Sequence, residues 1–272
     1  MMNVYVLGSG AALPAKGRHC SAQVVAVDGR RFLLDCGEGA QTQLRIAHQK
    51  LQSLNHIFIS HLHGDHLFGL PGLLSTMHMC GRKDPVDIYA PAGLKPALDL
   101  LFEVSGSHID FEMRHHELAS DQPEVLIEDA KLRVTAFPLS HSVPAYGYHF
   151  QELSLRHPNS YAYCCDTGYT EQFLPVVKGV DLLCLESTFM SDYEPVAVEK
   201  GHLTAPQAAT LALKAEARQL MLTHFSARYS DIEPLLAEAR QVFPNTIPAI
   251  EGRMIEVRHY PKGCEPQLEN HQ

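Results

Sequence analysis

The sequence lacks several features that would place it in other classes of protein. No apolar run is long enough to span a membrane, and the first residues have no basic flank ahead of a signal-length apolar segment. The formal net charge is −9 and the pI is near 6.0, so no overall positive field attracts nucleic acid. We therefore expect a cytoplasmic protein outside the membrane, in which any RNA is held by metal ions or a local basic patch.

Paired cysteines, internal repeats and linkers are absent as well. The seven cysteines are an odd number, and no two of them have the CxxC spacing. Reduced thiols in or near the core are expected instead of disulfides. A chain of 272 residues with 45% hydrophobic content is sufficient for one large core, so we expect a single domain over 1–272 with a loose tail at 261–272.

The densest group of chemically active residues lies in the segment 58–70. His61, His63, Asp65 and His66 directly follow an apolar run at 56–59 that has the pattern of a buried strand. Residues two apart in an extended chain share a face, so His61 and His63 are expected to point the same way, with Asp65 and His66 in the turn that follows. Zinc and similar cations take imidazole nitrogen and carboxylate oxygen, so this segment predicts a two-metal site completed from elsewhere in the chain.

Four later strands are predicted to end near a histidine or an acidic residue. A sheet holds the ends of its strands rigid while the loops beyond them stay open to solvent, so ligand groups collect there. The strands at 131–137, 160–165, 180–185 and 219–223 lead to His141, Asp166, Glu186 and His224.

The remaining pattern mixes strands with helices. Asp28-Gly29 is a favoured turn pair and predicts a hairpin between 21–27 and 31–34. Thr204 is expected to cap a helix at 204–214, with Pro206 in its first turn. Further strands are predicted at 3–7, 86–90 and 146–150, further helices at 41–50 and 94–104, and a helix start at 67–74.

The opening motif, followed by His141, Asp166 and His224, resembles the metallo-β-lactamase superfamily, whose motif is His-x-His-x-Asp-His. The sequences of further segments are similar to those of ribonuclease Z, the tRNA 3′-processing endonuclease. These segments are 35–41, 60–74, 146–148, 166–167, 186–189, 201–209 and 223–229. The resemblance runs from Gly8 to Tyr229. It implies an α/β fold, a four-layer αβ/βα sandwich with two mixed β-sheets flanked by helices, and a homodimer.

The resemblance also implies a ligand set for two zinc ions, with manganese or iron as other candidates. The first ion is assigned His61, His63 and His141, the second Asp65, His66 and His224, and Asp166 bridges both. Two cations about 3.5–4 Å apart can share a hydroxide near neutral pH and can stabilise charge on the attacking and leaving oxygens of a phosphodiester.

Proton transfer is assigned to three side chains. Asp65 is either a ligand alone or also the base that takes a proton from the water, and the resemblance implies the base role. His202 can give a proton to the leaving oxygen, while Glu186 holds its imidazole in the donor tautomer. Arg228 and Tyr229 either bind a phosphate or pair with a local acid.

One departure from the resemblance concerns the substrate. Ribonuclease Z proteins of bacteria usually carry a long arm that clamps the tRNA, placed before the bridging Asp-Thr, whereas only about ten residues, 151–160, stand there in this chain. The sequence therefore predicts a dinuclear zinc phosphodiesterase of the ribonuclease Z type, acting on tRNA 3′ ends or on a smaller phosphodiester.

Three other functions compete with this prediction. Hydrolysis of a thioester or a lactone uses the same metal motif, but it has no need of His202 and Glu186, which serve a poor alkoxide leaving group. An iron redox centre suits the same ligands, but it normally needs an attached electron-carrier domain, for which the chain has no room. A binding protein without catalysis has no need of a complete ligand set.

Overall fold

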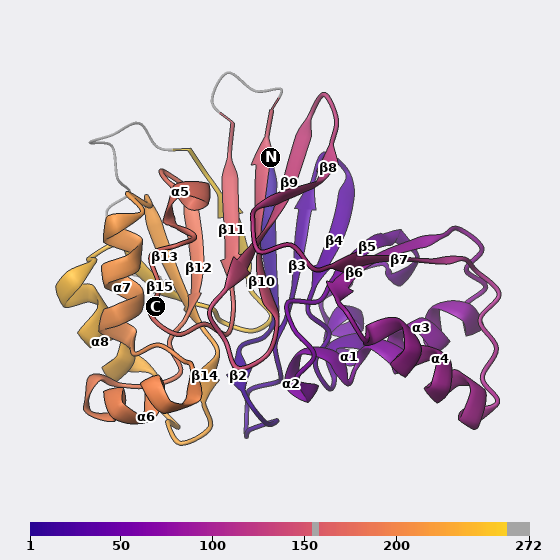
Figure 1. The fold of residues 1–272 in the computed structure, drawn as a ribbon, viewed down its shortest axis with the longest axis horizontal. Coiled ribbons are helices and arrows are strands. Elements are labelled where there is room, and N and C mark those ends of the chain that lie inside the picture. The colour runs from indigo at the N-terminus through magenta and orange to yellow at the C-terminus, as the bar shows by residue number, and fades with distance from the viewer. Residues whose placement is uncertain (154–157, 260–272) are drawn as a thin grey trace.

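The computed structural model describes residues 1–153 and 158–259. Within these residues two seven-stranded sheets lie face to face, and helices cover the outer face of each sheet (Figure 1). This arrangement confirms the predicted four-layer αβ/βα sandwich. The expected tail at 261–272 lies outside the described residues. That the chain forms one domain stays a prediction, supported by the core that the two sheets share.

The first sheet is mixed. One half is antiparallel, because β1 pairs with β16 and with β3, and β3 pairs with β4. The other half, from β4 to β7, is parallel. Its spatial order is β16 (Met254–Val257), β1 (Met2–Gly8), β3 (Ala22–Val27), β4 (Arg30–Leu34), β5 (Leu54–Phe58), β6 (Val86–Pro91) and β7 (Met113–Leu118).

The second sheet is mixed in the same way. The strands from β8 to β11 are antiparallel, and those from β11 to β15 are parallel. Its spatial order is β15 (Thr246–Pro248), β13 (Gln219–Thr223), β12 (Leu182–Glu186), β11 (Ser160–Cys164), β10 (Ala145–Glu152), β9 (Leu132–Leu139) and β8 (Glu124–Glu128). Two short strands, β2 (Gly10–Ala11) and β14 (Phe225–Ser226), pair in parallel and connect the loop after β1 to the loop after β13.

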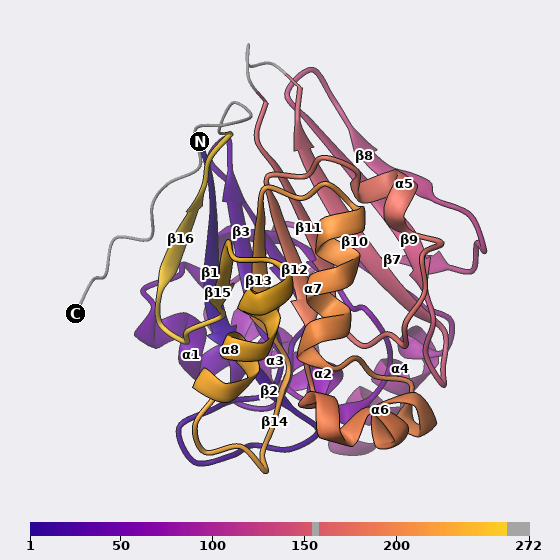
Figure 2. The same cartoon turned by 90° about the vertical axis from the view of Figure 1, so that its left-hand side faces the viewer.

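Each outer face is covered by amphipathic helices that bury their apolar sides against the strands. The first sheet carries α1 (Ala40–Ile46), α3 (Leu70–Met79) and α4 (Leu94–Ser105). The second carries α5 (Leu174–Val177), α7 (Ala205–Lys214) and α8 (Glu233–Val242), which stand in front of it in Figure 2. Shorter helical segments lie in the loops: α2 (Gly64–Leu67), α6 (Glu194–Lys200), and the 3-10 turns at Leu51–Ser53 and Ser191–Tyr193.

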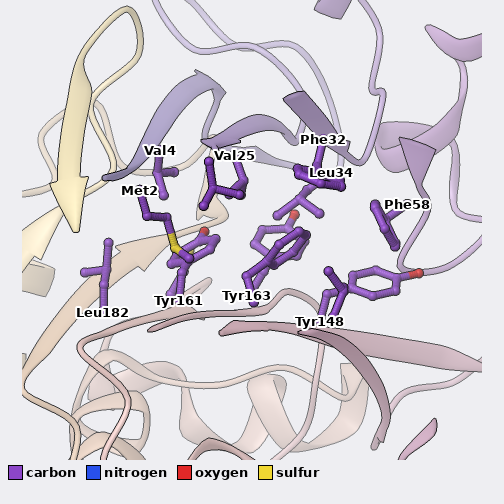
Figure 3. Close-up of a cluster of buried hydrophobic side chains, with 14 of the residues drawn as sticks. Met2, Val4, Val25, Phe32, Leu34, Phe58, Tyr148, Tyr161, Tyr163 and Leu182 are labelled. Atoms are coloured by element: carbon purple, nitrogen blue, oxygen red, sulfur yellow. The ribbon is translucent and has the colours of Figure 1, made fainter. Parts of the chain in front are cut away.

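The core between the sheets contains large aromatic side chains from both (Figure 3). On β11, Tyr161 and Tyr163 face the first sheet, whereas Ala162 and Cys164 pack against the helices on the other side. This alternation is the two-residue period of an extended strand. It positions the residues beyond Cys164 at the end of a strand that is buried on both faces.

The connection between β10 and β11 confirms that the long arm is absent. β10 ends at Glu152 and β11 begins at Ser160, so seven residues join two neighbouring antiparallel strands. A connection of this length can close a hairpin but cannot form an arm that reaches away from the sandwich.

Several predicted elements are confirmed, and the predicted end of one helix is wrong. The hairpin at Asp28-Gly29 forms, with positive φ at both residues as its turn requires. The predicted helix at 41–50 instead ends at Ile46. His48 adopts a φ of 53°, and the N–H of Gln49 bonds to the carbonyl of Leu44 at 2.8 Å, which closes the helix early.

The polar edge strands β7 and β8 were not predicted from the sequence, and neither were β15, β16, α6 and α8. An edge strand is not enclosed on both sides, so it lacks the continuous apolar run that reveals an inner strand. The described part of the chain has no helix long and apolar enough to cross a membrane.

The cap of α7 gives a testable stability prediction. Thr204 Oγ1 accepts the N–H of Gln207, and the Gln207 side chain accepts the N–H of Thr204, which completes a capping box. Thr204→Ala is expected to lower the free energy of unfolding by about 1 kcal/mol. Thr210→Ala makes the same chemical change inside the helix and is expected to be near neutral. Equal losses in urea unfolding would contradict the cap.

Candidate metal centre

The predicted ligands come together at one end of the two sheets. They lie in the loops after β5, β9, β11 and β13 and in α2, near β2 and β14 (Figures 1 and 2). The placement after strand ends is confirmed. Asp65 and His66 lie in the short helix α2 rather than in a turn, because the chain becomes helical directly after the extended residue His63.

The first group of ligand atoms consists of three imidazoles and one carboxylate. His61, His63, His141 and Asp166 each place one such atom within 4.8 Å of the others. His63 Nδ1 is 3.0 Å from His61 Nε2 and 3.3 Å from His141 Nε2. Asp166 Oδ2 is 3.5 Å from His61 Nε2. This spacing is typical of groups that share one cation.

The second group lies on the other side of Asp166. Its Oδ1 atom is 3.1 Å from His224 Nε2 and 3.3 Å from His66 Nε2. Asp65 Oδ2 is 3.3 Å from each of the same two nitrogens. The two oxygens of Asp166 thus face two different ligand groups, as a bridging carboxylate requires.

Asp35 fixes the orientation of two of these imidazoles. Its Oδ2 atom accepts Nδ1–H of His66 at 2.8 Å and the hydroxyl of Ser60 at 2.9 Å. Because Ser60 donates to Asp35, its oxygen accepts Nδ1–H of His61 at 3.1 Å. Both rings therefore carry their proton on Nδ1 and direct the lone pair of Nε2 into the site.

Glu186 fixes the orientation of a third imidazole, that of His224, through the hydroxyl of Thr188. Thr188 Oγ1 donates to Glu186 at 2.5 Å and accepts Nδ1–H of His224 at 2.9 Å. The carbonyl oxygen of Gly201 lies 3.0 Å from Nδ1 of His141. Because a carbonyl can only accept, Nδ1 of His141 carries the proton. The lone pairs of His224 and His141 are thereby also directed inward.

The residues present fit bound cations. Buried lone pairs 3.0–3.4 Å apart repel one another unless a positive charge lies between them. Asp166 is 3% exposed, and its Oδ1 atom has no hydrogen-bond partner among the described residues. Burial, together with the neighbouring His66, lowers the pKa of His61 to about 2, so its ring is neutral and available as a ligand. The donor set of nitrogen and carboxylate oxygen suits zinc.

Asp35 was missed as a site residue by the sequence reasoning, although it directly follows the strand β4. It is fully buried, and Tyr163 donates a further hydrogen bond to its Oδ2 atom at 2.7 Å. A carboxylate after a strand end is the same signal that indicated Asp166 and Glu186. Its application to 30–34 would have found this residue.

Replacing Asp35 with asparagine tests its role in ligand orientation. An amide cannot accept the three donors that meet at Oδ2, so His61 and His66 lose their fixed tautomer. We expect Asp35→Asn to weaken metal binding about 10- to 100-fold, measured by titration calorimetry. Asp87→Asn, a carboxylate paired with His116 outside the site, is the control. Unchanged affinity in Asp35→Asn would remove the orienting role.

A cavity of about 250 Å³ opens onto the ligands. Its lining includes Asp65, His202, Lys200 and Arg228, and the guanidinium of Arg228 lies 4.9 Å from the ring centre of Phe189. A substrate anion that enters therefore meets two positive side chains. A larger cavity of about 430 Å³ near α5 contains none of the predicted site residues.

The two predicted substrate-binding residues have different surroundings. Arg228 is exposed at the cavity, where it also lies 4.4 Å from the ring centre of Tyr193. The hydroxyl of Tyr229 accepts the N–H of Met190 at 3.0 Å, and its backbone carbonyl accepts a hydrogen bond from Arg18. Substrate contact by either residue stays a prediction.

His202 and Glu186 are brought together as predicted. His202 Nδ1 is 2.8 Å from Glu186 Oε1, and Glu186 is fully buried. Burial lowers the pKa of the His202 imidazole, but the Glu186 carboxylate outweighs it and raises the pKa to about 9. The ring is therefore protonated at neutral pH, with Nε2 free of this pairing.

The geometry agrees with a comparison of the sequence with known families. Residues 30–225 match the family described as Beta-lactamase superfamily domain. The chain therefore belongs to this superfamily, and it is a metal-dependent hydrolase.

Within the superfamily, the resemblance to ribonuclease Z is confirmed by whole-length relatives. Proteins named Ribonuclease Z from Bacteroides thetaiotaomicron and Azobacteroides pseudotrichonymphae are 36% and 40% identical, and the alignments cover 94% and 93% of this chain and 96% and 98% of theirs. The crystal structure of human tRNase Z, short form, has a TM-score of 0.81 and 32% identity, over 94% of this chain and 100% of that one.

Proposed function

We propose that the chain is a dinuclear zinc phosphodiesterase of the ribonuclease Z type that cuts at RNA 3′ ends or hydrolyses a smaller phosphodiester. The observation that supports this best is Asp166, whose two oxygens face two separate ligand groups. Held by these residues, a pair of divalent cations would lower the pKa of bound water and would neutralise charge on the phosphoryl group. The names of the relatives support RNA as the substrate.

The first task of the protein is to accept a proton from the attacking water. Asp65 lines the cavity, and the backbone N–H of Ala12 holds its Oδ2 atom at 2.7 Å. Burial raises the pKa of a carboxyl, but the imidazoles of His224 and His66 hold the pKa of Asp65 well below its usual range. Asp65 therefore stays ionised and oriented at the cavity, so it has a lone pair that can accept a proton.

The second task is to give a proton to the leaving oxygen. A sugar hydroxyl is a poor leaving group and needs that proton as the P–O bond breaks. His202 lies at the same cavity and carries its proton at neutral pH because Glu186 stabilises the imidazolium. A thioester or lactone hydrolase has no need of this pair, so the pair favours phosphodiester chemistry over that alternative.

The short β10–β11 connection bears on the substrate. The alignment with the Bacteroides thetaiotaomicron relative spans 302 positions. It includes 94% of the 272 residues of this chain, which occupy about 256 of those positions. More than 40 positions of that relative thus have no counterpart here.

We propose that the chain acts in the cytoplasm as a homodimer, and that RNA, when bound, is held by surfaces other than an arm.

The experiment compares two substrates on zinc- or manganese-loaded protein at matched salt: a 3′-extended pre-tRNA and bis(p-nitrophenyl) phosphate. Cleavage of both, with the RNA cut after the discriminator base, is the result expected of a ribonuclease Z without an arm. Cleavage of the diester alone assigns a smaller phosphodiester. Chelator-treated protein is the control, and activity towards neither substrate would overturn the proposal.

A further inference from the structure

A buried thiol lies in the second ligand group beside the predicted ligands. The Sγ atom of Cys165 is within 4.8 Å of ligand atoms of His66, Asp166 and His224. Zinc binds nitrogen at about 2.0–2.1 Å and sulfur at about 2.3 Å in a tetrahedral arrangement, so the ligand atoms of one ion stand about 3.3–3.6 Å apart. The four atoms lie within 4.8 Å of one another, so a contraction of about 1 Å at most brings them to the ligand spacing of a single ion.

The other contacts of this thiol are weak. Cys165 is fully buried, and the hydroxyl of Ser21 lies 3.9 Å from its sulfur. The neighbouring hydroxyl of Tyr163 donates its proton to Asp35. No strong hydrogen bond described for this thiol thus competes with coordination.

An independent observation indicates that the same place accepts a cation. Asp166 Oδ1 faces this group, is buried, and has no hydrogen-bond partner in the described part of the chain. A buried carboxylate oxygen without a hydrogen-bond partner is stabilised by a positive charge beside it. The surroundings of the thiol therefore favour a bound cation.

We propose that Cys165 is a protein ligand of the second metal position, beside His66, Asp166 and His224. The proposal rests on the proposed pair of metal ions. Coordination replaces the S–H bond with a sulfur–metal bond, and the released proton passes to the buffer. Thiolate is a soft ligand that selects zinc over manganese, whereas carboxylate and water suit manganese.

A ligand at Cys165 would also affect Asp65, which is assigned two roles, as a metal ligand and as a base. Asp65 lines the cavity, whereas Cys165 is fully buried away from solvent. If Cys165 helps to hold the ion, the Asp65 carboxylate, which lines the cavity, would be available to accept a proton from water.

The test uses cobalt(II) in place of zinc, because a cobalt–thiolate bond gives a charge-transfer band in the near ultraviolet. The full chain is stripped of metal and loaded with two equivalents of cobalt. The band is expected in the wild type and in Cys164→Ala, and its loss is expected in Cys165→Ser. Cys164 is a matched control, because it is also fully buried but packs against the helices on the other face of the sheet.

Metal competition gives a second readout. The preference for zinc over manganese at the second position is expected to fall at least about tenfold in Cys165→Ser and to stay unchanged in Cys164→Ala. An unchanged cobalt band together with an unchanged preference in Cys165→Ser would overturn the proposal.

A measurement on the wild type alone keeps the proposal testable if the variant does not fold. X-ray absorption of the zinc-loaded protein is expected to show a zinc–sulfur distance of about 2.3 Å beside nitrogen and oxygen at about 2.0–2.2 Å. Two bound zinc ions with nitrogen and oxygen neighbours alone would overturn the thiol ligand and leave the proposed function intact. A chain that binds no metal would overturn both.

Discussion

Asp65→Ala is expected to lower cleavage of bis(p-nitrophenyl) phosphate by at least about 10²- to 10⁴-fold, the contribution of a well-placed general base. The loss is expected even on this activated diester, because the attacking water must lose its proton whatever the leaving group is. The measurement is turnover at saturating substrate with fully zinc-loaded protein.

A nearby carboxylate provides the control for Asp65. Glu38 is exposed and lines a neighbouring cavity together with Asp65, so Glu38→Ala removes the same charge from the wall of that cavity. We expect Glu38→Ala to retain turnover. Asp65→Asn, assayed for metal content, separates the two roles: loss of turnover with both ions retained indicates a base. Retained turnover in Asp65→Ala would exclude Asp65 from the mechanism.

His202→Ala is expected to lower turnover by about 10²- to 10⁴-fold on diesters with an alkyl leaving group and by far less on p-nitrophenyl esters. The p-nitrophenolate ion leaves without a proton, whereas an alkoxide needs one. Kinetics on an alkyl and a p-nitrophenyl ester of the same phosphate measure the difference, so the second substrate serves as the control for folding and metal content.

The same pair of substrates tests Glu186. In Glu186→Gln the amide no longer stabilises the imidazolium of His202, so the alkyl ester should again lose more turnover. Equal losses on both esters in His202→Ala would show that His202 is not the acid. Such a result would point instead to a role in holding the site together.

The local part of the metal site could be predicted from the sequence. His61, His63, Asp65 and His66 lie within six residues, so the backbone alone brings them close. His141, Asp166 and His224 were found because each comes directly after, or two residues after, a strand with a strong apolar pattern. Such signals are local, since the propensity of a strand and the residue that follows it are read in one short window.

The orientation of those ligands could not be predicted in the same way. Asp35 reaches His66 across 31 positions of the chain and receives the hydroxyl of Tyr163 across 128. Thr188 and His224 are 36 positions apart. These contacts depend on which strands are neighbours, and no short window of sequence contains that information.

The sequence by itself determined the types of donor, the strands that carry them and the deletion of the arm, because each follows from local patterns or from chain length. Only the tertiary structure decided which nitrogen of each ring faces the site, and that the sulfur of Cys165 lies beside the second group. The physical reason is that hydrogen bonds and ligand spacing act over a few ångströms, and folding alone brings distant segments of the chain that close.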